Sequence, residues 1–174
     1  PWCGAGNLSI HLDRSIEIIC SLIDFYGKIV EQVGKEAGYH ILGNGLEDCV
    51  SLFEGFLKKI YSEKLNKKFN PEECVEKKKK LGNSFQQPVK AEQIFKTDLG
   101  IEIFKDIEIE NQDFLNYQFA KRHVITHNLG LVDEKFQVRV RSWQEVGQEI
   151  PLDSTEIKRV LEIIKKSIKS IIYV

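Results

Sequence analysis

The chain has 174 residues, of which 42% are hydrophobic and 29% are charged, and its formal net charge is −1. This length and composition predict a single domain with a sizeable core. The near-zero net charge excludes a global electrostatic attraction to nucleic acid or to a membrane surface, so any affinity for RNA has to come from local patches.

The sequence shows no sign of a membrane or secreted location. No apolar run is long enough to cross a bilayer, and the N-terminus lacks the cationic start and continuous apolar region of a secretion signal. Cys3, Cys20, Cys49 and Cys74 are widely spaced and form no Cys-x-x-Cys pair, which favours buried thiols over disulfides. We therefore expect a cytoplasmic protein that does not associate with membranes.

The first residues differ from the rest of the chain. Pro1-Trp2-Cys3-Gly4 contains a Cys-Gly pair of the kind found in one half of a zinc knuckle, and the chain has no methionine. We interpret residues 1–7 as a remnant of a zinc ribbon or a linker, and residues 8–174 as one helical domain. A plain N-terminus that has lost its initiator is the alternative.

Two amphipathic helices are predicted in the first third of the chain. Apolar residues recur every three or four positions from 12 to 33 and again from 46 to 61, which is typical of helices with one buried face. Gly43-Asn44-Gly45 between them predicts a turn. Glu47 and Asp48 lie off the second apolar stripe, and we interpret them as solvated residues that favour the helix start.

The middle of the chain is its most basic part. Asn70-Pro71-Glu72-Glu73 is a capping box with proline at the first helical position, so a short helix is expected to begin there. The four lysines at 77–80 point most of the way round such a helix, which favours a solvated face over a phosphate-binding groove. Apolar residues from Val89 to Leu99 predict a further core helix that ends at Gly100.

The segment 119–136 concentrates the polar chemistry of the chain. Arginine offers a planar fork of donors that fits phosphate, and histidine exchanges protons near neutral pH, so the two together suit phosphodiester chemistry. An apolar side anchors the helix that carries them. The candidate residues are Arg122, His123, Thr126, His127 and Asn128.

Two other interpretations of this segment stay open. Spacing of four residues places His123 beside His127 and Arg122 beside Thr126, so the cluster would also suit a solvated helix end whose cations complement the helix dipole. His-x-x-x-His could also present two imidazoles to a metal. Because Val124 replaces the glutamate of His-Glu-x-x-His and no third ligand lies nearby, we expect no metal here.

The chain after Asp133 changes its periodicity from helical to two. Phe136, Val138 and Val140 alternate with polar residues, which predicts a strand, and residues 143–152 could return as its hairpin partner. A second capping box at 153–156 opens a last helix that runs to residue 172. We therefore expect an all-α, up-and-down bundle of about five helices with a small β-hairpin insertion before the last helix.

Three basic residues are candidates for binding the RNA backbone. Lys121 directly precedes the arginine of the cluster. Arg139 and Arg141 would share one face of the predicted strand and could extend a phosphate-binding surface. An exposed strand face without a ligand is the alternative for these two arginines.

Arg-x-x-x-x-His-Asn, followed by Gly-Leu-Val-Asp-Glu-Lys-Phe, resembles the signature end of HEPN domains, in which an Arg-X4-6-His motif follows an aromatic-rich helix. The resemblance runs from about Leu46 to the C-terminus and is best over residues 113–136. Arg122 and His127 match the motif positions. His123 departs from the pattern, because many members carry a small polar residue directly after the arginine.

The resemblance implies a metal-independent endoribonuclease that needs no cofactor and cleaves single-stranded RNA as a homodimer with both motifs at one interface. His127 would deprotonate the ribose 2′-hydroxyl and Arg122 would stabilise the pentacoordinate phosphorus, with Asn128, His123 and Thr126 in support. A toxin or defence setting is also implied, with an antitoxin or a larger-chain partner. The alternative is a non-catalytic module that binds RNA, a nucleotide or a protein, or a dimerisation scaffold.

Overall fold

The computed structural model describes residues 5–140 and 144–174, and this part of the chain is helical without a β-strand. Its α-helices are α1 (Ala5–Asp24), α2 (Tyr26–Gln32), α3 (Lys35–Lys68), α4 (Pro71–Leu81), α5 (Pro88–Ile94), α6 (Ile109–His127), α7 (Glu134–Val140) and α8 (Ser154–Ile172). A 3₁₀ turn (Ser84–Gln86) precedes α5, and a π-helical turn (Phe95–Leu99) follows it. The all-α prediction is confirmed, although the helices outnumber the five expected.

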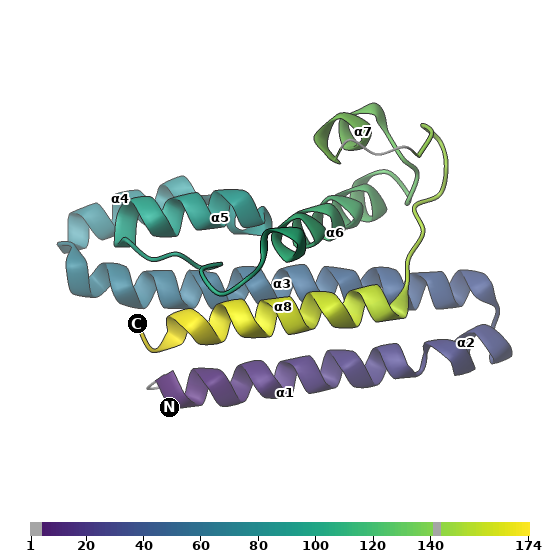
Figure 1. Cartoon of the computed structure of the whole chain (residues 1–174), viewed down its shortest axis with the longest axis horizontal. Coiled ribbons are helices and arrows are strands. Elements are labelled where there is room, and N and C mark those ends of the chain that lie inside the picture. The colour runs from purple at the N-terminus through teal and green to yellow at the C-terminus, as the bar shows by residue number, and fades with distance from the viewer. Residues whose placement is uncertain (1–4, 141–143) are drawn as a thin grey trace.

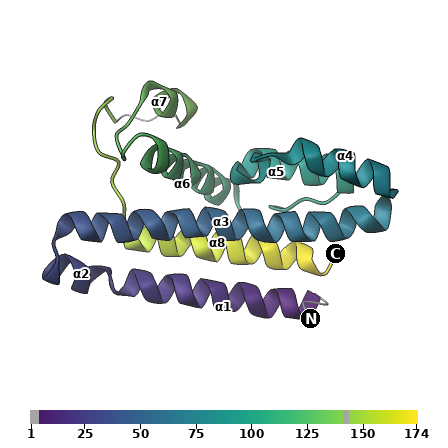
Figure 2. The same ribbon diagram turned by 180° about the vertical axis from the view of Figure 1, so that it is seen from behind.

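Three long helices, α1, α3 and α8, lie side by side and form the base of the bundle (Figures 1 and 2). The end of α3 near the chain termini is covered by α4 and α5, and its opposite half is covered by α6. Helix α7 lies on the outer side of α6, away from α3. None of the described helices is both long enough and apolar enough to cross a membrane. The end of α6, which carries the motif, therefore lies over the first turns of α3.

The core is built around α3, which contacts α1, α6 and α8. Phe53 lies in its middle and is fully buried, with its ring stacked 6.2 Å from that of Phe104 and edge-on to Phe119 at 5.4 Å. Phe119 belongs to α6, so this aromatic contact fixes the motif helix on α3. The isoleucine-rich stripe of α8 covers another side of α3.

The predicted turn at Gly43-Asn44-Gly45 is wrong, because these residues lie inside α3. Their glycines serve close packing instead. A Cβ atom on Gly45 would lie 3.0 Å from Cδ1 of Ile23 in α1, and one on Gly43 would lie 3.4 Å from Cγ2 of Ile125 in α6. Two helices, α1 and α6, thus approach α3 at the two positions of this stretch that lack a side chain.

The two helix starts predicted from capping sequences, at Asn70 and Asp153, are confirmed. Asn70 and Glu73 form the reciprocal capping box of α4, with the Glu73 backbone N–H donating to Asn70 Oδ1 at 2.9 Å. Asp153 caps α8 by accepting from the backbone N–H groups of Thr155 (2.7 Å) and Glu156 (3.1 Å). These local signals were readable because each cap satisfies backbone donors within its own turn.

The predicted β-hairpin is wrong, since its first strand is the helix α7. Phe136 is buried with Val132 in a small second core against α6, whereas Val138 is 81% exposed. The alternating pattern therefore did not mark one buried strand face. After residue 143 the chain runs as a loop, joined to the segment after α6 by an isolated bridge between Leu131 and Glu149.

The expected N-terminal remnant, residues 1–7, is only partly described. Helix α1 begins with Ala5, Gly6 and Asn7, so these three residues belong to the helical domain, and residues 1–4 lie outside the described residues.

Replacing Gly45 by leucine should lower the thermal midpoint, because the new side chain would separate α3 from α1. We expect a loss of about 1–3 kcal/mol, the usual cost of overpacking a core. Gly55→Leu in the same helix is the matched control, since a Cβ atom there meets nothing within 4 Å; leucine is also the better helix former. Equal midpoints for the two variants would contradict this packing.

Candidate functional site

The motif helix α6 is anchored by its apolar side and ends at His127. Leu115, Phe119 and Val124 are buried. The backbone N–H of Asn128 still bonds to Val124 O at 2.8 Å, and its side-chain Nδ2 donates to Leu131 O at 2.5 Å. Asn128, which was expected to orient substrate, therefore uses its amide nitrogen to close the turn after the helix.

Arg122 is held by a glutamate of α3. Its Nε and Nη2 atoms both donate to the carboxylate of Glu47, and its Nη1 donates to Gln86 Oε1 at 3.3 Å. The Arg122 side chain is only 13% exposed, compared with 36% for Glu47. Thr126 adds a bond to the same carboxylate, from Oγ1 to Oε2 at 3.0 Å. Arg122 and Thr126, one helical turn apart, thus share one anion.

Glu47 is the site residue that the sequence interpretation missed. We expected it to be solvated, but hydrogen bonds from Arg122, together with the charge of that guanidinium, the Thr126 bond and the charge of His127, outweigh partial burial and lower the pKa of the Glu47 carboxyl. It is therefore anionic at neutral pH. Glu47 and Arg122 lie 75 positions apart, so no local spacing could have revealed the pair.

His123 and His127 lie beside each other on the exposed face of α6, with ring centroids 4.7 Å apart and planes tilted by 53°. Partial burial lowers the pKa of His123 first, and the charges of His127, Arg139 and Arg122 lower it further. His123 is therefore biased toward the neutral form. Among the described contacts no hydrogen bond joins Arg122 to His127, and Glu47 is the group that both approach.

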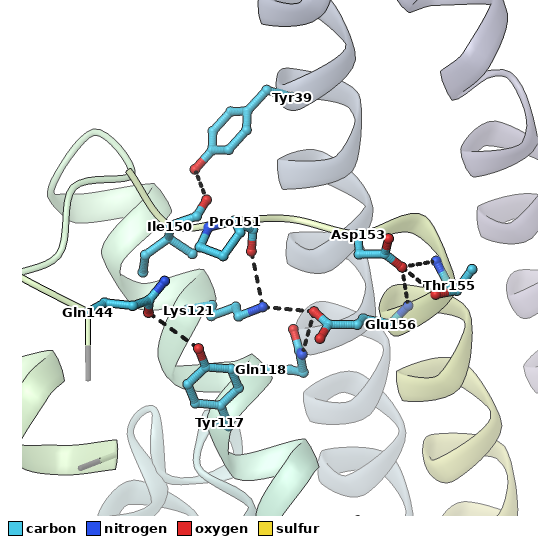
Figure 3. Close-up of polar contacts among 10 residues, drawn as sticks. All are labelled: Tyr39, Tyr117, Gln118, Lys121, Gln144, Ile150, Pro151, Asp153, Thr155 and Glu156. Atoms are coloured by element: carbon cyan, nitrogen blue, oxygen red, sulfur yellow. Dashed lines mark hydrogen bonds and ion pairs between the residues drawn. The ribbon is translucent and has the colours of Figure 1, made fainter. Parts of the chain in front are cut away.

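Lys121 was expected on an RNA-binding surface, but it is 2% exposed and its ammonium group is engaged inside the protein (Figure 3). Its Nζ donates to Glu156 Oε2 at 2.8 Å and to Pro151 O at 3.0 Å, and it lies 5.0 Å from the ring centroid of Tyr117. Gln118 reaches the same carboxylate oxygen of Glu156 at 3.0 Å. Lys121 therefore ties α6 to the start of α8, and its expected role is corrected.

Of the two other basic residues predicted to bind the RNA backbone, the structure describes Arg139 but not Arg141. Arg139 is exposed on α7, and its charge acts on His123, so it lies on the same side of the molecule as the imidazole pair. It belongs to a helix and not to the strand that was expected to present it. Arg141 lies outside the described residues.

The described residues offer no set of three histidine, cysteine or acidic side chains arranged to hold a metal ion. The pair of His123 and His127 supplies two nitrogens, whereas zinc sites in proteins use three or four protein ligands. What the cluster does present is a guanidinium with an oxyanion bound to it and two exposed imidazoles nearby. This chemistry suits anion binding and proton transfer.

A double-mutant cycle of Glu47→Gln and Arg122→Met should give a coupling free energy of about 1 kcal/mol at pH 7, reduced by the exposure of Glu47. Because the folded pKa of Glu47 lies below its ordinary 4.5, this stabilisation is fully present above pH 4.5 and is lost as the pH falls through the folded pKa. Urea unfolding at pH 7 and pH 3 measures it.

The control for this cycle is the exposed pair of Lys59 and Glu63 on α3, whose side chains are both nearly half exposed. Its coupling should be smaller at pH 7. Two results would contradict this account of the Glu47–Arg122 pair. One is a coupling free energy at pH 7 no larger than that of Lys59 with Glu63, and the other is a coupling free energy that is unchanged at pH 3.

Comparison with family models, with curated proteins and with solved structures gives no match for this chain. The resemblance to HEPN domains therefore rests on the motif string around Arg122 and His127.

Proposed function

We propose that this chain is a HEPN-like, metal-independent endoribonuclease that cleaves single-stranded RNA at a site containing Arg122 and His127. The observation that supports it is the bidentate grip of the Arg122 guanidinium on a carboxylate, close to two exposed imidazoles. The two non-bridging oxygens of a phosphodiester can accept from a guanidinium in the same bidentate manner as a carboxylate. Phosphate would take the place of Glu47 on the guanidinium.

The chemistry would be an attack of the ribose 2′-hydroxyl on the adjacent phosphorus. His127 accepts the proton of the hydroxyl, the new O–P bond forms, and the bond to the 5′-oxygen breaks. Arg122 stabilises the charge that builds up on the pentacoordinate phosphorus. The products are a 2′,3′-cyclic phosphate and a free 5′-hydroxyl end, and the guanidinium supplies the positive charge that a metal supplies in other nucleases.

Supporting roles follow from the contacts around these two residues. Thr126 bonds to Glu47 and keeps that carboxylate at the edge of the site when phosphate displaces it from Arg122. His123 touches the ring of His127 and is the group left to orient it, because the amide nitrogen of Asn128 is used in the turn. A positioning role for His123 agrees with its bias toward the neutral form.

We propose a homodimer, because the 5′-oxygen needs a proton as it leaves and one base cannot easily deliver a second proton. An imidazole of a second copy, brought in with its own motif, would supply it. RNA is then the substrate, and an antitoxin or a larger-chain partner would control the activity in the cytoplasm. The exposed face of α6 with His123 and His127 is the surface on which the two copies would meet.

A second candidate function is a non-catalytic module for RNA, a nucleotide or a protein, or a dimerisation scaffold. One observation favours it. Arg122 is largely buried, and each of its three nitrogens already has an acceptor in Glu47 or Gln86. In this case the arginine would fasten α6 to α3 and the imidazole pair would be a solvated helix end.

Cleavage of short single-stranded RNA by the purified chain tests the proposal. It should continue in excess EDTA, leave 2′,3′-cyclic phosphate ends and stop when the ribose 5′ of the scissile bond is replaced by deoxyribose. His127→Ala should reduce the rate by at least about 100-fold, the contribution typical of a positioned base. His123→Ala should reduce it less. Gel analysis and mass spectrometry of the products measure these effects.

Arg14→Ala is the control, because Arg14 is an exposed arginine of α1. Helix α1 lies across the bundle from α6 (Figure 1). The Arg14→Ala variant should leave the rate unchanged, whereas Arg122→Lys, which keeps the charge but loses the planar fork, should lower it. Activity that disappears with EDTA and returns with zinc or manganese would refute the mechanism. No cleavage of any RNA by the folded dimer would favour the binding module.

A further inference from the structure

A pocket of about 500 Å³ lies between the first turns of α3 and the end of α6, a volume in the range of small-molecule sites. Its α3 wall is a polar row at helical spacing that consists of Glu36, His40, Asn44 and Glu47. Thr126 and Leu129 come from the α6 side. Glu47 is shared, because the same carboxylate that lines the pocket also binds Arg122. The pocket therefore adjoins the guanidinium that the proposed mechanism assigns to phosphate.

Two glycines shape the walls of this pocket. Gly43 leaves space on α3, where a Cβ atom would come within 3.4 Å of Ile125. Gly130, with a φ of 77°, lies so close to Tyr39 that a Cβ atom would be 2.7 Å from the phenol oxygen. That hydroxyl donates to Ile150 O at 3.0 Å (Figure 3). Tyr39, a residue of α3, thus ties this side of the pocket to the loop before α8.

Leu129 stands at the rim in an uncommon conformation. Its φ of 55° is in the left-handed region that residues other than glycine rarely adopt, and its side chain is 92% exposed. The structure thus holds a large apolar side chain in water beside the pocket. An apolar rim over a polar wall suits a flat ligand with one apolar face and hydrogen-bonding edges.

The lining also determines the charge of the ligand. It contains the carboxylates of Glu36 and Glu47 but no lysine or arginine, so phosphate itself is disfavoured inside. Carboxylates accept hydrogen bonds from N–H groups, as they do from the exocyclic amine of cytosine. Asn44 and His40 add both donors and acceptors. The complementary ligand carries no negative charge, is planar and presents an amine at its edge.

We propose that this pocket binds an amine-bearing nucleobase, namely adenine, guanine or cytosine, of the single-stranded RNA whose phosphate contacts Arg122. The base stacks against Leu129, and its amine donates to Glu36. The inference rests on the proposed function in that it takes the base to be part of an RNA substrate. It predicts that uracil, which has no exocyclic amine, is the base that this subsite selects against.

Free nucleosides test the pocket without any phosphate or cleavage step. Adenosine, guanosine, cytidine and uridine are titrated into the full chain, and binding is followed by NMR through the backbone amides of Asn44 and Leu129. At least one amine-bearing nucleoside should bind more tightly than uridine. Glu36→Gln and Asn44→Ala should each weaken its binding by about tenfold, the equivalent of one hydrogen bond.

Glu17→Gln on α1 and Asn66→Ala near the other end of α3 are the matched controls, since both residues are exposed and remote from the pocket. They should leave nucleoside binding unchanged. Circular dichroism of Glu36→Gln and Asn44→Ala checks that each variant is folded, and the backbone N–H resonances of a folded variant still report on the pocket.

Failure of nucleosides to perturb these amides at millimolar concentration, or equal binding of uridine, would overturn the proposal. Binding of putrescine in place of nucleosides would also overturn it and would mark the pocket as a cation site. The two proposals fail separately. Nucleoside binding by a chain that cleaves no RNA supports the pocket and refutes the nuclease, whereas cleavage without nucleoside binding does the reverse.

Discussion

The ion pair between Glu47 and Arg122 is the interaction on which the candidate site depends. It joins the helix at the centre of the bundle to the helix that carries the motif, and two hydrogen bonds orient the guanidinium toward Glu47. A bidentate pair of this kind fixes direction as well as distance. The pair also keeps the charge of Arg122 balanced in a largely buried position, where an unpaired cation would be costly. The Glu47 carboxylate therefore both orients the Arg122 guanidinium and balances its charge.

Gly43 of α3 lets α6 approach closely enough for this pair to form. Because Gly43 lets Ile125 approach the helix backbone, the last turns of α6 lie close enough for Arg122 and Thr126 to reach Glu47 one turn farther along α3. The small second core around Val124 and Phe136 then holds the loop after α6 in place. The helix end, the turn at Asn128 and the pocket beside them thus form one contiguous region, with the imidazole pair exposed on α6.

Sequence patterns predicted the elements whose signals are local. The stripes of α1, α3 and α8 and the caps at Asn70 and Asp153 were readable, since periodicity and capping act within a few turns. Gly43 and Gly45 were misinterpreted because the sequence alone does not distinguish a glycine that ends a helix from one that allows a neighbouring helix to pack closely. The valines of α7 were misinterpreted because the alternating segment, residues 136–140, is too short to distinguish the two-residue period of a strand from a short amphipathic helix.

The candidate site shows the same difference between local signals and contacts that join distant parts of the chain. Arg122, His123, Thr126 and His127 could be named as candidates because they are neighbours in the sequence, and the structure places them at one helix end. Glu47 was missed and Lys121 was misassigned, because the partner of each lies far away in the chain, at Arg122 and at Glu156. Whether a charged residue faces solvent or a buried counter-ion is decided by tertiary contacts, which a single sequence does not display.

The central claim is that Arg122 exchanges the Glu47 carboxylate for a phosphate of RNA. The most direct measurement is the NMR signal of the Arg122 Nε–H group while a 2′-O-methyl RNA, which cannot be cleaved, is added to the chain. Our account predicts that this signal shifts and that Glu47→Gln, which removes the competing anion, makes the shift occur at lower RNA concentration. An Nε–H signal that stays unchanged while the RNA binds elsewhere would contradict it.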